Sequence, residues 1–429
     1  MSRPDRDPAG PPAGGERIAM LLENNPYPQD VRVRSEAESL AAHGHQVLVI
    51  APRGAGQPRR ERLNGVEVRR FRLVDGSARG ALGFLLEYAI AAVALHVGAI
   101  RQLCGGATTL HLHNPPDILF PAGAIYRLAG RRVVFDHHDL FPETIEVKLG
   151  SATAVRVANA CQRLTIAVAD HVIATNASYA EVARRSGKRE DEVTIVRNGP
   201  PAAWIDRPLA ARTGVLEEIR LAYLGAISSQ DGVDGLAAIL AALRERPDSV
   251  RAVLTVIGDG DGRPAVERAL ADHGVLGQVT FTGRVAPGDV PPLLEAADVC
   301  VDPAPPTDVN QRSTMTKIAE YLALGKPVVA YDLLETRRTA GDAALLVPPG
   351  DAGAFAEAVH RLAVDPDLRL RLARDGRERA ASLTWARSEE ALLSVYSRLR
   401  VRRRRAWSRP RPRRLAPREG RRSSRRRTG

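Results

Sequence analysis

Residues 313–332 read Ser-Thr-Met-Thr-Lys-Ile-Ala-Glu-Tyr-Leu-Ala-Leu-Gly-Lys-Pro-Val-Val-Ala-Tyr-Asp. Apolar side chains recur at helical spacing from Met315 to Leu322, and Ser313 is a residue type that often caps the start of a helix. Gly325, followed by Lys-Pro, is typical of a helix end, and Val-Val-Ala at 328–330 is typical of a buried strand. The stretch therefore predicts a helix over 313–325 that leads into a strand.

Two charged residues give this predicted helix a possible ligand. Lys317 and Glu320 are three residues apart, so both side chains project from one side of the helix, near its N-terminal half. Free backbone N–H groups at a helix start hold phosphate, and a carboxylate one turn later can accept hydrogen bonds from sugar hydroxyls. The alternative is a Lys–Glu pair on a solvated helix face, and the spacing alone leaves both open.

The length and the charge distribution bound the protein class. A chain of 429 residues is long enough for two domains with sizeable cores. The net charge of +12 is local, because residues 401–429 contain 14 Arg and one Glu, and the first 400 residues are therefore close to neutral. We expect 401–429 to be a disordered tail that can attract an anionic membrane surface. Nucleic-acid binding through the tail is the alternative, but the chain has no recognised nucleic-acid module, so no specific nucleic-acid partner is expected.

The cysteines and the N-terminus indicate a cytoplasmic protein. Cys104, Cys161 and Cys300 lack the spacing of a metal site or a disulfide framework, which suits a reducing compartment. Residues 1–16 are rich in Pro and Gly and have no apolar core, so they predict a disordered leader rather than a signal peptide.

The first ordered segment predicts a βαβ unit. An apolar strand at 17–22 is followed by a loop at 24–30, a helix that ends at Gly44 and a second strand at 46–51. In a doubly wound α/β domain, ligands lie beyond the carboxyl ends of the strands, which is where Asn25 falls. Arg32, at the helix start, has two interpretations: it could meet an anionic acceptor or lie on a solvated face. No G-x-G-x-x-G sequence follows the first strand, so a dinucleotide cofactor is not indicated.

Residues 81–100 form an almost continuous apolar run, interrupted by Glu87 and His96. A membrane span needs about 20 apolar residues with few charges, so this run is borderline. We expect a helix that packs in the first domain and is partly exposed; contact with a membrane surface is the alternative role.

Histidines follow two further strands, in His-Leu-His-Asn-Pro-Pro-Asp at 111–117 and Asp-His-His-Asp at 136–139. Both lie where an open α/β sheet places ligand groups. His113, Asn114 and Asp117 are therefore predicted to lie near a ligand site. The spacing matches no known metal site, so no metal is expected. A second domain is predicted from residue 219, where the strand at 219–224 ends at Gly225, whose small size allows a backbone approach to a pyrophosphate.

These motifs together resemble those of family 4 retaining glycosyltransferases of the GT-B fold, especially members that assemble polysaccharides. The resemblance rests on several stretches in the family's order, over roughly residues 17–398: NNPYPQDVRVRSEAESLAAHGHQVLVIAP, HLHNPPDILF, VVFDHHDLFPE, YLGAISSQDGVDGL, IGDGDG, VTFTGRV, LLEAADVCVDP and STMTKIAEYLALGKPVVAYD.

The resemblance implies an α/β protein of two Rossmann-like doubly wound domains that face each other across a cleft. The expected organisation is the leader (1–16), an acceptor domain (17–205), a linker (206–218), a nucleotide-sugar donor domain (219–383), a helix that crosses back to the first domain (384–400) and the tail (401–429).

The resemblance also implies roles for individual residues. The expected catalytic group is His138, Asp139, Lys317 and Glu320; the donor-binding group is Gly225, Arg284, Arg312, Ser313, Thr314 and Thr316; the acceptor-side group is Asn25, Arg32, His113, Asn114 and Asp117. No metal or other cofactor is implied, because the nucleotide sugar is a substrate.

The sequence departs from the family pattern at the donor phosphates and at the paired glutamates. The family's usual Arg and Lys positions are here Ala226 and Asp231, and the position eight residues before Glu320 is Arg312 rather than an acid. The identity of the donor sugar therefore stays open.

The implied reaction is transfer of a hexosyl group from a nucleoside diphosphate sugar to a glycan, plausibly lipid-linked, by a cytoplasmic or peripheral membrane enzyme of polysaccharide biosynthesis. A nucleotide-sugar epimerase or a glycoside phosphorylase on the same scaffold is the enzymatic alternative. An anionic-polymer or membrane-binding protein that acts through its tail is the non-enzymatic one.

Overall fold

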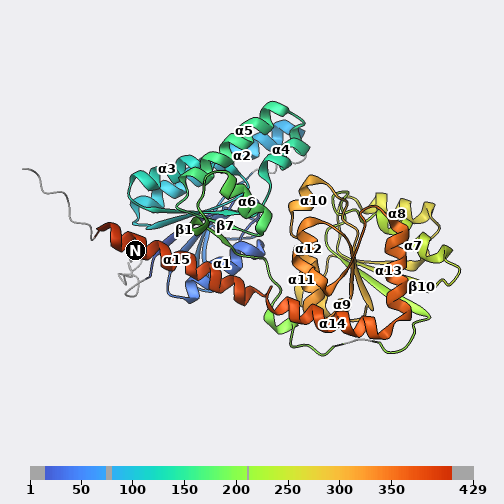
Figure 1. Ribbon diagram of the computed structural model, residues 1–429. Helices are drawn as coiled ribbons and strands as arrows, with labels where there is room; N and C mark the ends of the chain where they lie inside the picture. Colours follow the sequence, from blue (N-terminus) through green and yellow to red (C-terminus); the bar gives the residue numbers. More distant parts are fainter. Residues whose placement is uncertain (1–14, 74–79, 210–211, 408–429) are drawn as a thin grey trace, which may run out of the picture.

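The computed structural model describes residues 15–73, 80–209 and 212–407, and these form two α/β domains that lie side by side (Figure 1). The predicted leader at 1–14 and the tail at 408–429 lie outside the described residues. Glu16, which the sequence assigned to the leader, is buried and accepts a hydrogen bond from the hydroxyl of Thr109. That assignment was therefore wrong at residue 16, because Glu16 packs at the start of the first strand.

The first domain contains an eight-stranded sheet in the order β3-β4-β2-β1-β5-β6-β7-β8, parallel except for the β3–β4 pair. Its strands are β1 (Arg17–Leu21), β2 (Gln46–Pro52), β3 (Arg60–Leu63), β4 (Val66–Phe71), β5 (Thr109–His113), β6 (Arg132–His137), β7 (His171–Ala174) and β8 (Val193–Ile195). Its helices are α1 (Val31–Ala42), α2 (Gly80–Cys104), α3 (Phe120–Leu128), α4 (Phe141–Leu149), α5 (Ala152–Val168) and α6 (Ala177–Arg185). From β1 the strand order runs toward one edge of the sheet through β2 and toward the other edge through β5. Doubly wound proteins bind ligands at the carboxyl ends of the strands on either side of such a change in order.

The second domain contains a six-stranded, wholly parallel sheet in the order β11-β10-β9-β12-β13-β14. Its strands are β9 (Glu218–Leu224), β10 (Arg251–Ile257), β11 (Val279–Gly283), β12 (Val299–Asp302), β13 (Val328–Tyr331) and β14 (Leu345–Val347). Its helices are α7 (Gly235–Glu245), α8 (Arg263–Asp272), α9 (Val290–Glu295), α10 (Asp308–Arg312), α11 (Thr316–Ala323), α12 (Leu334–Ala340), α13 (Ala352–Val364) and α14 (Pro366–Ala381). This is the strand order of the Rossmann fold, in which the order changes direction between β9 and β12.

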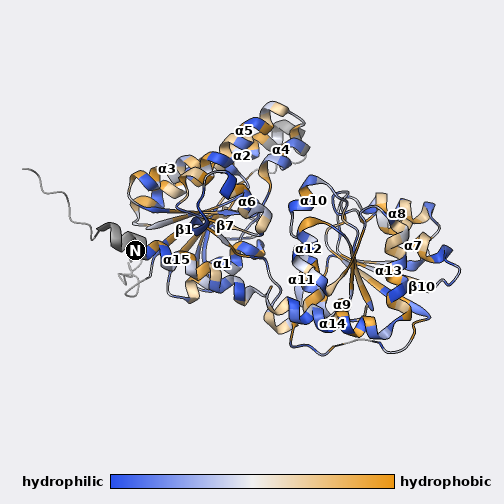
Figure 2. Cartoon of the chain, viewed as in Figure 1, coloured by the Kyte–Doolittle hydropathy of each residue, from blue (hydrophilic) through white to orange (hydrophobic). Residues whose placement is uncertain are grey.

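Apolar strands lie at the centre of both domains, and polar residues cover the outer helix faces (Figure 2). In the first domain, β1 separates two layers of core: Ala19 and Leu21 face the layer that includes α2, α3, α5 and α6, and Ile18 and Met20 face the layer that includes α1. Alternate side chains of a strand point to opposite faces, so a strand covered on both faces is apolar throughout.

The last helix, α15 (Trp385–Trp407), leaves the second domain and runs along the first (Figure 1). Leu392, Val395, Tyr396 and Leu399 complete the core layer that contains Ile18 and Met20. The helix continues to Trp407, so the prediction that the helix ends at residue 400 and disorder begins at 401 was wrong for residues 401–407.

The helix predicted over 313–325 begins later than expected. α10 ends at Arg312, and Ser313 follows it, donating its N–H to the carbonyl of Val309 (2.9 Å), so Ser313 does not cap the next helix. The side-chain cap of this region is Thr307, which accepts from the N–H of Asn310 at the start of α10. α11 then begins at Thr316 without a side-chain cap, and Gly325 follows its end at φ 64°, as predicted.

The apolar run at 81–100 lies within α2, a helix of 25 residues. Ala91, Leu95 and Ala99 are buried, whereas Val93 and Val97 are exposed, so α2 packs on the sheet along one face. In the described ranges, no helix has the combination of length and apolarity that a membrane crossing requires.

Candidate functional site

A cavity of about 400 Å³ lies between the two domains. Five of the predicted site residues line it: Asn25, Arg32 and His138 from the first domain, and Thr316 and Glu320 from α11 of the second. The loop after β1, the turn after β6 and the start of α11 each supply part of the wall, and Figure 1 shows α11 on the side of the second domain that faces the first. The structure therefore brings together residues from all three predicted groups.

Glycines let three strand ends of the second domain approach one another. Gly225 has φ 148° and Gly258 has φ 137°, conformations that side chains rarely adopt. A Cβ atom on Gly258 would lie 2.0 Å from the carbonyl oxygen of Gly225, and Gly258 also pairs with Gly283. The carboxyl ends of β9, β10 and β11 thus meet at backbone, and we call these three glycines the glycine surface.

Lys317 lies beside this surface, and its ammonium group is already engaged. Its Nζ is 3.0 Å from the hydroxyl of Tyr223, 3.3 Å from Asp231 and 3.5 Å from Asp302, and it lies over the Tyr223 ring. Burial alone would lower the pKa of Lys317, but Asp302, Tyr223 and Asp231 together raise it. The lysine is therefore charged, and its charge is already paired with carboxylates of its own domain. The sequence predicted Lys317 as a cation close to Gly225 but not its two carboxylate partners.

Glu320 lies one turn further along α11 and is half-buried in the cavity wall. Burial raises the pKa of Glu320, and the charge of Lys317 opposes that rise. Within residues 15–73, 80–209 and 212–407, no hydrogen bond or ion pair is made by its carboxylate, so it is available to a ligand in the cavity.

The segment between α10 and α11 is held by the first domain. Arg312 forms an ion pair with Glu143 (3.1 Å), and the side-chain amide of Asn176 donates to the carbonyl of Arg312 (2.8 Å) and to the hydroxyl of Thr314 (3.0 Å). Arg312 and Thr314 therefore join the two domains instead of lining the cavity. Arg284 is exposed after β11 and does not line it either.

The predicted acceptor-side residues divide into two sets. Asn25 and Arg32 line the cavity, whereas His113, Asn114 and Asp117 are fully buried behind it. The side-chain oxygen of Asn114 accepts from the backbone N–H groups of His138 (2.7 Å) and Asp139 (3.1 Å), so Asn114 fixes the turn that carries them. Asp139 lies outside the cavity wall, and its carboxylate accepts from the N–H of Leu140. His113, Asn114 and Asp117 are buried, so the predicted direct contact between these three residues and an acceptor does not occur in this conformation.

The solvated-face interpretation of Arg32 was wrong, because its guanidinium is buried. It donates to both oxygens of Asp136 (2.7 Å each) and lies 3.1 Å from Glu36. Arg32 is thus committed to carboxylates of its own domain, and it contributes little free charge to an anionic acceptor.

Four buried side chains around Arg32 have the chemistry of metal ligands: Glu36, His111, His113 and Asp136 offer atoms within 4.8 Å of one another. Burial and the charge of Asp136 raise the pKa of Glu36 well above its usual range, whereas burial lowers the pKa of both histidines. With Glu36 protonated and the histidines neutral, Arg32 and Asp136 already balance each other. In these protonation states a divalent cation would add uncompensated charge to the buried cluster, and the absence of a metal stays a prediction from the sequence.

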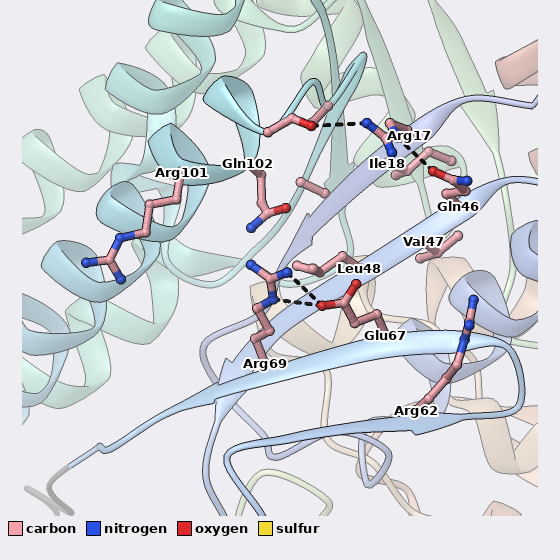
Figure 3. Close-up of a pocket in the computed structure, with 13 residues that line it drawn as sticks. Arg17, Ile18, Gln46, Val47, Leu48, Arg62, Glu67, Arg69, Arg101 and Gln102 are labelled. Atoms are coloured by element: carbon pink, nitrogen blue, oxygen red, sulfur yellow. Dashed lines mark hydrogen bonds and ion pairs between the residues drawn. The ribbon is translucent and has the colours of Figure 1, made fainter. Parts of the chain in front are cut away.

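A second hollow lies at the opposite, amino end of the first sheet (Figure 3). Arg17 donates there to Gln46 (2.7 Å), and Arg69 pairs with Glu67 (2.7 Å). The hollow lies away from the strand ends where an α/β sheet binds ligands.

The buried carboxyl group of Asp117 should make the stability of the protein depend on pH. Burial raises the pKa of Asp117 to about 8, whereas an unfolded Asp titrates near about 4. Between these values the folded chain holds a proton that the unfolded chain has lost, so this group makes the fold less stable as the pH rises. Asp117→Asn removes the titration, and we expect the stability of the variant relative to wild type to grow by up to about 1.4 kcal/mol per pH unit from pH 4 to 8.

Urea unfolding at pH 5.5 and 7.5 checks this, with Asp375→Asn, an exposed position on α14, as the control. Equal differences at the two pH values for Asp117→Asn would contradict it.

Sequence reasoning missed several residues that organise the site. Asp136, Tyr223 and Asp302 each end or precede the end of a buried strand and hold a predicted site residue, and Asn176 bridges the domains. A charged residue at the end of an apolar strand was the available signal for Asp136 and Asp302. Nothing local to Asn176 indicates a partner on another domain.

Two family models match the chain. Residues 29–199 match a glycosyl transferase 4-like domain, and residues 218–365 match glycosyl transferases group 1. Among curated proteins, the chain is 27% identical over 191 residues to the alpha-D-kanosaminyltransferase of Streptomyces kanamyceticus (44% of this chain, 48% of that protein). It is 33% identical over 153 residues to the lipopolysaccharide core biosynthesis glycosyltransferase LpsE of Rhizobium meliloti (34% and 41%). These matches span about half the length of the relatives or less.

Among solved structures, HepE of Anabaena in complex with UDP-glucose superimposes with a TM-score of 0.64 at 18% identity, over 89% of this chain and 99% of that one. This likeness shows the fold. The chain thus carries two glycosyltransferase domains, a 4-like domain followed by a group 1 domain, arranged in the two-domain GT-B fold.

Proposed function

We propose that this protein is a retaining glycosyltransferase that moves a hexosyl group from a nucleoside diphosphate sugar to a glycan acceptor. The observation that carries the proposal is the cavity in which Glu320 and Thr316 of the second domain meet His138 and Asn25 of the first. A transfer enzyme must hold both substrates in contact with each other. In each domain the ligand is expected beyond the strand ends where the strand order changes direction, and the cavity lies between these two places.

The donor is assigned to the second domain. The diphosphate would approach the glycine surface formed by Gly225 and Gly258, beside Lys317 and the uncapped N–H groups at the start of α11. The ammonium of Lys317 is already paired with Asp231 and Asp302. The N–H groups at the start of α11 and the helix dipole would therefore contribute more to phosphate stabilisation than they would beside an unpaired lysine. Glu320 would accept hydrogen bonds from sugar hydroxyls.

The reaction breaks the bond between the anomeric carbon and the phosphate oxygen, and the electron pair leaves with the nucleoside diphosphate. The acceptor hydroxyl oxygen bonds to the same face of that carbon, and its proton passes to the departing phosphate. The resemblance to retaining enzymes motivates this front-face course. Besides Glu320, the cavity wall contains the carboxylate of Asp30, which accepts from the N–H of Val33 and caps α1. LpsE acts in lipopolysaccharide core biosynthesis, which supports a cell-surface glycan as acceptor. A lipid-linked acceptor at a membrane face stays a prediction from the sequence.

A thermal-shift screen of UDP, GDP and ADP and their sugar conjugates tests the proposal, since a ligand at 100 times its Kd stabilises the fold by about 2.7 kcal/mol. We expect one nucleotide series to stabilise the protein. Glu320→Ala should weaken donor binding by about 10- to 100-fold, because a hydrogen bond to a charged group contributes about 1.5–3 kcal/mol.

Glu245→Ala, an exposed position at the end of α7, is the matched control. Identical donor-induced shifts in wild type and Glu320→Ala would reject the site assignment. Release of nucleoside diphosphate that depends on a glycan acceptor separates transfer from epimerisation, which releases none, and from phosphorolysis, which needs inorganic phosphate.

A further inference from the structure

His138 presents two different edges of its ring to its surroundings. Its Nδ1 is completely buried and lies 3.5 Å from Oδ2 of Asp136, while the residue also forms part of the cavity wall. The opposite edge of the ring, which carries Nε2, is therefore the edge that the cavity can reach. A neutral imidazole has one nitrogen that donates and one that accepts, and a partner at one nitrogen decides the role of the other.

Asp136 is fully buried and is held as a fixed acceptor by groups of its own domain. Arg32 binds both of its oxygens, and Nδ1 of His113 lies 3.2 Å from Oδ2. Burial would raise the pKa of Asp136, but Arg32, His138 and His113 together hold it well below its usual range. An ionised carboxylate accepts about four hydrogen bonds, and Nδ1 of His138 is a buried neighbour with no hydrogen-bond partner in the described part of the chain.

We propose that Asp136 is a positioning residue: it keeps His138 in the tautomer with the proton on Nδ1, so that Nε2 faces the cavity as a hydrogen-bond acceptor. The ligand that Nε2 recognises is then a hydroxyl group, such as that of a sugar, and not a carbonyl or a phosphate oxygen. The distance of 3.5 Å is long for a hydrogen bond, and such contacts commonly shorten when substrate binds.

Identification of that hydroxyl as part of a sugar rests on the proposed function, but the tautomer does not. If the protein proves to catalyse a reaction of another class and His138 has the proton on Nδ1, the inference is supported and the proposed function is rejected. If the protein transfers a sugar and His138 has the proton on Nε2, the proposed function is supported and the inference is rejected.

The test is the nitrogen NMR spectrum of the full chain labelled with ¹⁵N-histidine, in which the two ring nitrogens of each tautomer have distinct shifts. His138→Gln identifies the His138 signals by their loss. In wild type we expect the protonated nitrogen of His138 to be Nδ1, and in Asp136→Asn we expect the ratio of the two tautomers to move toward Nε2–H.

Asp136→Asn leaves Arg32 without its carboxylate and can unfold the domain, so the double variant Arg32→Met/Asp136→Asn, which removes both charges, gives the same readout in a neutral interior. Asp170→Asn is the control, since that carboxylate contacts Arg132 and the N–H of Val133 rather than His138. A wild-type spectrum with the proton of His138 on Nε2 would overturn the proposal, as would a stoichiometric metal ion in the purified protein that is lost in His111→Gln.

Discussion

Replacing Arg32 with methionine is expected to destabilise the fold by about 3–5 kcal/mol, the usual cost when one partner of a buried ion pair is removed. Asp136 would lose two hydrogen bonds of 2.7 Å in a fully buried position. Arg32 also donates to the carbonyl of Val196 and to Asn198, so the segment directly after β8 would lose two further bonds.

Urea unfolding at pH 7 measures the loss, and Arg34→Met is the matched control on the same helix. Arg34 is half-buried, and in the described residues its guanidinium forms no ion pair and no hydrogen bond, so we expect a change below about 1 kcal/mol. Arg32→Met/Asp136→Asn should recover part of the stability, because it leaves no buried charge unpaired. A loss below about 1 kcal/mol for Arg32→Met alone would show that water reaches the cluster.

Replacing Gly258 with alanine is expected to cost at least about 3 kcal/mol and to abolish nucleotide-induced stabilisation. The added Cβ would lie 2.0 Å from the carbonyl oxygen of Gly225, a contact that only backbone movement can relieve, and the residue has a φ of 137° that alanine disfavours. That movement would separate the ends of β9 and β10, where we place the diphosphate.

Gly277→Ala is the control for this variant, since its Cβ would have no atom within 4 Å and its φ is not in the left-handed region. Thermal unfolding with and without the nucleotide identified in the screen gives both readouts. A Gly258→Ala protein that stays stable and binds nucleotide normally would remove the glycine surface from the proposed donor site.

The sequence predicted the elements of the fold well where the pattern is local. The strand at 328–330, the helix end at Gly325 and the strands at 17–22 and 46–51 follow from spacing and residue type alone. The start of α11 was predicted incorrectly because two capping residues, Thr307 and Ser313, lie close together, and only the upstream one caps a helix.

The site was predicted less completely, because its organisation depends on partners that are distant in the sequence. Lys317 is balanced by Asp231, which lies 86 residues earlier, and Arg32 is committed to Asp136, 104 residues later. Local spacing identified the residue types that chemistry would need. It could not show which of them are neutralised by a partner from another strand.

The path of α15 has a consequence for the order in which the molecule is completed. Leu392, Val395, Tyr396 and Leu399 of α15 fill the core layer over Ile18 and Met20. The first domain is therefore assembled from residues that precede the second domain and from a helix that follows it. On the ribosome, its β1–β8 portion emerges while one side of its sheet still lacks its cover, and the second lobe can become native first. The two lobes are therefore not interchangeable modules that a cut in the connecting segment would release intact.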